Sequence, residues 1–521
     1  MYYSLDIFFR PIRCFSPDSD LQIRERSMSQ RIPFPEPSVQ PIFKRYGLVA
    51  ALAGLLLILA APGLTVAGHR MLALLVFSVI LWMTEGVSYP VSGMIIATLM
   101  TFLVGTSPNP EKAGALYGTS QGLTMALAGF SNTAWALVGA ALFLSAAMAK
   151  TGLDRRIALK ILSVIGVSAN RILIGVILVG FVLSFFVPST TARVAYMVPI
   201  VAGIITALGV DRSSRFAAML MIAIAQADSI WNVGIKTAAA QNMIAVNFIK
   251  QQLGHDITWI EWFIAAAPYA AIMSVVLYYV LIKLIPPDIK EIPGGREIIN
   301  NQLAALGPMS PPEKKLLCIS IALLFLWTTE KILHDIDTST STLAAITLMM
   351  VPRFGIMNWE EAQQRIAWGT LFLFGIGISL GSAIISTKAG VWLAMAIVPF
   401  FGLSHAPALL IVLTLAAFLI IIHLGFASAT GLAAAMIPVI IEMLKNISTP
   451  GLNIIGMTMI LQYVVSFGFI LPVNAPQNMI AFGTNTFSVP QFIRTGIPLT
   501  IIGYLLIGLL SATYWKFLGL V

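Results

Sequence analysis

The chain is poor in charged residues. Only 10% of its 521 residues are Asp, Glu, Lys or Arg, whereas 58% are hydrophobic. Soluble domains usually contain about 25% charged residues, so this composition argues against an ordinary soluble enzyme or binding module. Apolar stretches recur along the chain, and the need for about 20 apolar residues per crossing predicts roughly ten to twelve spans. We therefore expect an all-α polytopic membrane protein.

Cysteine and the common catalytic motifs are also scarce. Cys14 and Cys318 are the only cysteines, so no disulfide framework is expected. The sequence has no Gly-x-x-x-x-Gly-Lys-Ser/Thr run, which disfavours an ATP-driven pump, and no convincing zinc motif, Ser/Lys dyad or carboxylate pair of an intramembrane hydrolase. We expect no enzymatic activity, and hence no catalytic residues, no metal and no organic cofactor.

The net charge of +9 comes from scattered basic residues and not from a basic stripe, so we expect no nucleic-acid partner. Basic residues are frequent before the first apolar stretch, and the positive-inside rule then predicts a cytoplasmic N-terminus. The lipid bilayer is the expected surrounding, in a bacterial inner (plasma) membrane. These basic residues are Arg10, Arg13, Arg24, Arg26, Arg31, Lys44 and Arg45.

Polar segments divide the chain into four parts. No long apolar stretch precedes Pro33, so a signal peptide is not expected, and Met28 would serve as well as Met1 as a start. A segment rich in Pro and Gly follows Ile285 and suits a loop between two apolar halves. The expected parts are a disordered cytoplasmic tail (1–45), a first transmembrane repeat (46–285), a cytoplasmic linker (286–315) and a second transmembrane repeat (316–521).

The two apolar halves share motifs in the same order. Gln-Asn-Met-Ile-Ala at 241–245 recurs at 477–481, and each copy follows a Ser/Thr cluster, at 189–191 and 428–430. Ser189 precedes the first copy by 52 positions, and Ser428 precedes the second by 49. Such a repeat in so apolar a chain is typical of secondary transporters whose two halves meet around one central site.

Each half also contains two short apolar segments joined by a polar tip. The arms are shorter than an ordinary span, so they predict re-entrant hairpins whose tips face a solvated cavity. In the first half the arms are 136–149 and 157–166 around a tip at 150–156, and in the second they are 368–385 and 391–401 around a tip at 386–390.

From about Tyr46 onward this order of motifs resembles the divalent anion/sodium symporter family. There a Ser-Asn-Thr motif marks the break of a discontinuous helix in each half, and a Thr-Pro-Pro-Asn-type motif marks a second break. Their counterparts here are 189–191, 428–430, 239–242 and 475–478. The resemblance implies an inverted-repeat, homodimeric secondary transporter with two re-entrant hairpins and discontinuous helices. It implies transport of dicarboxylates, citrate-like tricarboxylates or sulfate by alternating access.

A small anion at membrane depth loses its hydration, so hydroxyls, amides and the positive ends of broken helices must replace the water. An isolated Ser or Thr in a membrane helix more often bonds back to the preceding turn, but duplicated clusters favour a binding role. The predicted substrate-binding residues are Ser189, Thr190, Thr191, Ser428, Thr430, Asn242, Pro476 and Asn478.

A second set concerns the coupling cation. The resemblance makes sodium the candidate coupling ion, but Thr190 and Ala429 stand where the family motif has Asn, so sodium symport and exchange both remain open. Arg193 and Lys236 either add positive potential for a dianion or form a structural pair with Asp228. The candidate cation-binding or charge-compensating residues are Ala238, Ala427, Asn474, Arg193, Lys236 and His423, of which His423 suits a satisfied core histidine better than a proton relay.

Two further expectations complete the sequence analysis. Ser131-Asn132-Thr133 spells the family tripeptide, but it precedes an apolar stretch and predicts a helix start. For function, an organic dianion carrier is the main hypothesis. A carrier of an inorganic oxyanion, sulfate or arsenite-like, and an anion channel are the alternatives.

Overall fold

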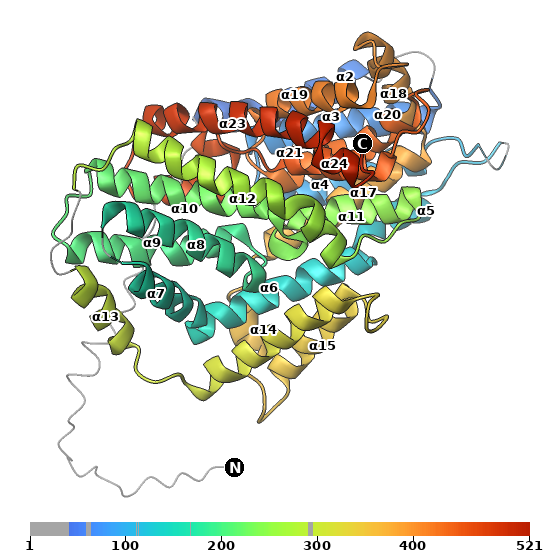
Figure 1. Ribbon diagram of the computed structural model, residues 1–521. Helices are drawn as coiled ribbons and strands as arrows, with labels where there is room; N and C mark the ends of the chain where they lie inside the picture. Colours follow the sequence, from blue (N-terminus) through green and yellow to red (C-terminus); the bar gives the residue numbers. More distant parts are fainter. Residues whose placement is uncertain (1–40, 59–63, 111, 113, 167, 290–294) are drawn as a thin grey trace, which may run out of the picture. The chain divides into compact units, whose positions relative to one another are not determined.

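The computed structural model describes residues 41–58, 64–110, 112, 114–166, 168–289 and 295–521 (Figure 1). These residues form helices joined by loops, with isolated bridges but no β-strand among them. Most of the expected tail, residues 1–40, lies outside the described residues, and the first described helix, α2, begins at Pro41. The described residues belong to a single compact unit, so the helices of both halves pack together.

The helices follow one another with few long connections. The first half contains α2 Pro41–Ile58, α3 Val66–Thr84, α4 Tyr89–Gly105, α5 Thr119–Leu127, η1 Ala128–Phe130, α6 Thr133–Thr151, α7 Leu153–Ile165, α8 Ala169–Phe186, α9 Thr190–Ala207, α10 Arg215–Gly234, η2 Lys236–Ala238, α11 Ala240–Leu253 and α12 Trp259–Leu284. After α13 Gly295–Ala305, the second half contains α14 Pro311–Thr329, α15 Thr338–Met350, α16 Trp359–Gln363, α17 Trp368–Ser386, α18 Ala389–Phe400, α19 Ala408–His423, α20 Ala429–Lys445, α21 Ile454–Val465, η3 Pro472–Asn474, α22 Pro476–Phe482, α23 Val489–Ala512 and α24 Tyr514–Phe517.

The order of helices repeats as the motifs do. The series from α6 to α12, with η2 before α11, recurs as the series from α17 to α23, with η3 before α22. The segment expected to link the halves holds α13 and the start of α14. Within the described residues, eight helical segments are long and apolar enough to cross a membrane: α3, α6, α8, α9, α10, α12, α17 and the joined α23–α24. The protein is therefore an all-helical polytopic membrane protein, as the composition predicts.

The expected short hairpin arms are only partly present. A helix pair does lie at each expected place, turned at Gly152 (φ +72°) and at Lys388 (φ +60°). However, α6 and α17 are each 19 residues long and rank among the candidate spans, so the expectation that both arms are short was wrong. α6 continues through the first two residues of the expected tip and ends at Thr151, whose hydroxyl bonds back to the Ala147 carbonyl at 2.9 Å.

Charged residues of the first tip form ion pairs with carboxylates of the second half. Lys150 pairs with Glu361 at 2.5 Å, and Arg156 pairs with Glu313 at 2.7 Å. Arg156 also donates to the carbonyl of Gly307, which ties α7 to the segment between the halves. The expectation that these tips face the central cavity is wrong, because no residue of either tip is among the described residues that line the pocket between the two halves. In the first tip, Lys150 and Arg156 pair with carboxylates instead.

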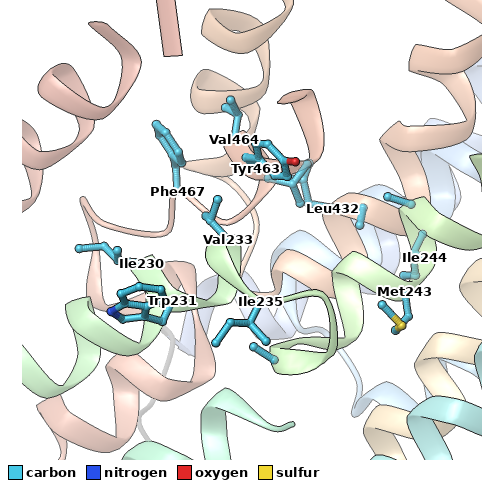
Figure 2. Packing of buried hydrophobic residues seen from close by; sticks show 14 of the residues in the cluster. Ile230, Trp231, Val233, Ile235, Met243, Ile244, Leu432, Tyr463, Val464 and Phe467 are labelled. Atoms are coloured by element: carbon cyan, nitrogen blue, oxygen red, sulfur yellow. The ribbon is translucent and has the colours of Figure 1, made fainter. Parts of the chain in front are cut away.

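The core runs through both halves. α10 packs against α8, α9 and α12 of its own half and against α22 of the other. Its residues from Phe216 to Gly234 are all buried, as expected for a helix that is surrounded by protein. Figure 2 shows part of this hydrophobic cluster, to which α10, α11, α20 and α21 contribute Val233, Met243, Leu432 and Tyr463. The core thus holds α10 and its polar side chains in a fixed place.

Candidate functional site

A helix break in each half exposes a new helix N-terminus. α8 ends at Phe186. Pro188 interrupts the helix because it lacks an N–H and disfavours a helical conformation of the residue before it. Ser189 then caps α9, with its hydroxyl oxygen accepting from the Ala192 N–H at 3.4 Å. In the second half, α19 ends at His423, and Ser428 caps α20 in the same way. The two predicted Ser/Thr clusters therefore lie at helix starts.

A second break follows in each half, where a short 3₁₀ turn precedes α11 and α22. The Asn242 side-chain amide donates to the carbonyls of Asn232 (2.7 Å) and Ile235 (3.1 Å). Asn478 donates in the same manner to the Gly468 carbonyl at 2.7 Å. Carbonyls at the end of an interrupted helix lack their helical N–H partners, and these two amides supply the missing donors.

The N-termini of α9, α11, α20 and α22 meet at one pocket of about 950 Å³, which includes space open to solvent. Backbone N–H groups at helix starts and the helix dipoles both favour a bound anion. Among the described residues that line the pocket there is no Asp, Glu, Lys or Arg. The polar lining consists of Ser189, Thr190, Thr191, Asn232, Thr237, Gln241, Trp327, Thr342, Thr370, Ser428, Thr430, Gln477 and Tyr89.

Most of the predicted substrate-binding residues lie at this pocket. Ser189, Thr190, Thr191, Ser428, Thr430 and Pro476 line it, whereas Asn242 and Asn478 lie behind the breaks and do not. The Thr190 hydroxyl donates to the Asn232 Oδ1 at 2.6 Å. The hydroxyls of Thr191 and Thr430 form no hydrogen bond within the described part of the chain, which leaves them available to a ligand.

The pocket also contains residues that the sequence analysis missed. Gln241 of the first half donates to the Ser466 hydroxyl at 3.3 Å, and Gln477 of the second donates to the Ser229 hydroxyl at 3.1 Å. Each glutamine thus bonds to the opposite half. The repeated pentapeptide begins with these glutamines, so the signal was present. Tyr89, in contrast, follows no repeated motif, and the sequence offered no sign of its position.

Arg193 lies behind the pocket and is fully buried. Its Nε pairs with the Asp228 Oδ1 at 2.7 Å, and one terminal nitrogen donates to the carbonyls of Val187 (2.7 Å) and Ala238 (3.0 Å). The other terminal nitrogen donates to the Asn232 Oδ1 at 2.8 Å. The guanidinium therefore fills the space between the two breaks of the first half and touches the pocket only through Asn232.

In the second half an amide takes this place. Asn474 Nδ2 donates to the carbonyls of His423 (2.9 Å), Leu424 (3.1 Å) and Phe426 (3.3 Å). The Nε2 of buried His423 lies 3.3 Å from the Asn474 carbonyl oxygen, and its Nδ1 has no partner in the described part of the chain. Ala427 lies in the break itself. Four carbonyls at the two first breaks thus already have protein donors: those of Val187, His423, Leu424 and Phe426.

Lys236, another predicted charge, does not reach the central pocket. It is buried, donates to the Ile257 carbonyl at 2.5 Å, and lines a neighbouring cavity with Asn247 and Glu330. The literal Ser-Asn-Thr run is a helix start, as predicted, because Asn132 caps α6 by accepting from the Ala134 N–H at 2.7 Å. No group of three or more His, Cys, Asp and Glu side chains that could hold a metal occurs in the described residues.

Comparisons with known proteins agree with this architecture. A family model described as the sodium:sulfate symporter transmembrane region matches residues 40–521. A membrane protein of Cupriavidus necator is 56% identical over 478 residues, which cover 91% of this chain and 93% of that protein. The sodium-dependent dicarboxylate transporter SdcS of Staphylococcus saprophyticus is 28% identical over 466 residues, covering 85% of each chain. Its namesake in Staphylococcus aureus is 26% identical and covers 84% of each.

Among solved structures, the YdaH transporter of Alcanivorax borkumensis matches with a TM-score of 0.48 and 13% identity, over 82% of this chain and 98% of that one. The family assignment rests on the family model, which spans nearly the whole described chain, from the first helix to the C-terminus. The protein thus belongs to the sodium:sulfate symporter family, the divalent anion/sodium symporters, which are secondary transporters and not enzymes.

Proposed function

We propose that this transporter carries small divalent organic anions, dicarboxylates or citrate-like tricarboxylates, by alternating access. The observation that supports this proposal is the convergence of four helix N-termini on one pocket whose described lining residues include no Asp, Glu, Lys or Arg. In such a pocket a dianion meets N–H groups and hydroxyls on several sides and no carboxylate that would repel it. The hydroxyls of Thr191 and Thr430, one from each half, are the proposed direct ligands.

The names of the relatives support the same substrate class. Both SdcS proteins are called dicarboxylate transporters, and their matches extend over most of this chain. The family description, in contrast, names sulfate. A neutral pocket of hydroxyls and amides suits both an organic and an inorganic dianion. Transport of an inorganic oxyanion is therefore the alternative, and a direct comparison of substrates must distinguish the two.

We further propose that exchange carries much of the flux and that sodium dependence is weak. Sodium prefers hard oxygen ligands, such as carbonyls at helix breaks. Here Arg193 occupies the carbonyls of Val187 and Ala238, and Asn474 occupies three carbonyls of the second half. A guanidinium is permanently charged, so Arg193, although paired with Asp228, keeps a fixed cation close to the place where a mobile cation would otherwise bind.

Alternating access requires a structural basis, and the repeated helix order supports one. The series α6–α12 and α17–α23 place their breaks around the same pocket. In transporters built from inverted repeats, the two halves alternate in exposing a shared site to the two sides of the membrane. We propose this arrangement here, with the four breaks as the shared site.

The test is uptake of labelled succinate, citrate and sulfate into proteoliposomes. Vesicles are either empty or loaded with unlabelled succinate, each with and without an inward sodium gradient. We expect saturable succinate or citrate uptake that depends on loading more than on sodium. Uptake of sulfate alone would favour the oxyanion alternative, and a flux that does not saturate would indicate a channel. Steep sodium-driven accumulation in empty vesicles would overturn the exchange proposal only.

A further inference from the structure

A second polar pocket, of about 550 Å³, lies at the ends of three helices and shares no residue with the central pocket. Arg215 begins α10, Lys283 lies in the last turn of α12, and Arg494 lies in the second turn of α23. Gln491, one turn before Arg494, also lines this pocket. Three cations from both halves of the chain therefore surround one hollow.

The side chains of these three cations have no acidic partner among the described residues. None of them takes part in an ion pair within the described part of the chain. Asp288 lies nearby, but its carboxylate accepts from the backbone N–H groups of Arg215 and Phe216, both at 3.2 Å, and so caps the start of α10. Like charges held around one hollow repel each other, and a bound anion would remove that repulsion.

Exposed apolar side chains lie on the same helices as two of these cations. On α12, Val275 and Tyr279 are 56% and 57% exposed and lie two turns and one turn before Lys283, respectively. On α23, Ile497 and Ile501 are 43% and 54% exposed and follow Arg494. α12 and α23 also pack against each other. In a membrane-spanning chain, two exposed apolar stripes that end at a cationic pocket match the shape of a phospholipid, with a charged headgroup and two acyl chains.

We propose that this pocket binds the headgroup of an anionic phospholipid. The headgroup phosphate lies among Arg215, Lys283 and Arg494, and the acyl chains follow the exposed faces of α12 and α23. Arginine forms forked hydrogen bonds that suit phosphate oxygens, and the unused Nε2 of Gln491 adds a donor. Because α10 and α12 belong to the first half and α23 to the second, the lipid joins the two halves on one side of the membrane and stabilises their packing.

Native mass spectrometry of the purified, delipidated full-length protein tests this proposal. The protein is titrated with phosphatidylglycerol, phosphatidylcholine and inorganic phosphate, and its melting temperature is followed in parallel. The wild-type protein should retain phosphatidylglycerol and melt at a higher temperature with it. At about 1 kcal/mol per basic residue, the variant R215Q/K283Q/R494Q should bind phosphatidylglycerol about 100-fold more weakly.

The matched control is R212Q/R296Q/K314Q, which removes the same charge from exposed residues outside the pocket. It should bind phosphatidylglycerol as the wild type does. If the pocket variant does not fold, the single change Arg494→Gln, at an exposed residue, should still weaken binding about fivefold. Equal losses in both triple variants, equal binding of phosphatidylcholine, or equal stabilisation by inorganic phosphate would each overturn the proposal.

Discussion

At the first breaks of the two halves, backbone carbonyls receive hydrogen bonds from two different kinds of side chain. In the first half a guanidinium, Arg193, donates to the Val187 carbonyl at the first break and to the Ala238 carbonyl at the second. In the second half a neutral amide, Asn474, donates to three carbonyls at the first break. Both arrangements meet the same need, since a buried carbonyl without a donor costs free energy. The repeat thus preserves the hydrogen bonding of the break but not its charge.

The asymmetry extends to the neighbouring helices. In the register that aligns Ser189 with Ser428, Arg193 corresponds to Leu432, which is buried in the hydrophobic cluster (Figure 2). Arg193 in turn requires Asp228, and both side chains are almost fully buried. A buried ion pair therefore stands beside the break in the first half only, and substitutions can test what this difference contributes.

The largest effect is expected for Arg193→Gln. The change leaves the Asp228 carboxylate buried without its partner, so the free energy of unfolding should fall by about 3–5 kcal/mol. The double variant Arg193→Gln/Asp228→Asn removes both charges and should recover most of that loss. Thermal unfolding of the purified proteins measures both.

The folded double variant also tests coupling. If Arg193 acts as a fixed cation, this variant should lose exchange-driven uptake although it is folded. Wild-type exchange in the double variant would instead show that the pair is structural only, and the proposed role of Arg193 in coupling would have to be withdrawn.

A smaller effect is expected for Asn474→Leu, which keeps the size of the side chain but removes its donors to three carbonyls. No charge is left unpaired, so we expect a loss of about 1–3 kcal/mol in the free energy of unfolding. Asn300→Leu, at an exposed residue of α13, is the control and should change little. A larger loss for Asn474→Leu than for Arg193→Gln would reverse the comparison of the two breaks.

The hydroxyls of the two clusters should matter for affinity and not for stability. Thr191→Val and Thr430→Val keep the side-chain shape and remove a hydroxyl that has no partner among the described residues. Each should raise the KM for uptake about tenfold, the value of one hydrogen bond to a charged ligand, with unchanged melting temperature. Ser131→Ala, outside the pocket, should leave the KM unaltered. Wild-type KM values in both valine variants would remove these residues from the site.

Cysteine labelling can test on which side of the membrane each helix turn lies, and it needs no transport measurement. Arg155 and Ser386 are exposed next to the turns that join α6 to α7 and α17 to α18. In a protein with Cys14 and Cys318 replaced by Ser, Arg155→Cys and Ser386→Cys should react with an impermeant thiol reagent from opposite sides of the membrane. Reaction of both from the same side would contradict the inverted repeat.

The sequence located the breaks better than it assigned the residues beside them. Gln241 and Asn242 are neighbours in the same repeated pentapeptide, yet only Gln241 lines the pocket, whereas Asn242 braces the chain behind it. Successive helical residues point about 100° apart, so a repeated motif marks a position along the chain and not a direction. The first hairpin tip was misplaced for a related reason, because its Lys150 and Arg156 pair with distant carboxylates.

By itself the sequence determined the membrane class, the repeat and the helix starts at Ser189 and Ser428. These features depend on composition and on local backbone preferences, such as capping by Ser and interruption by Pro188, which need no partner from elsewhere in the chain. Only the tertiary structure decided that Arg193 pairs with Asp228 and that Gln241 and Gln477 bond to the opposite halves. Such contacts join residues far apart in sequence, and they exist only because helix packing fixes which face of each helix meets which neighbour.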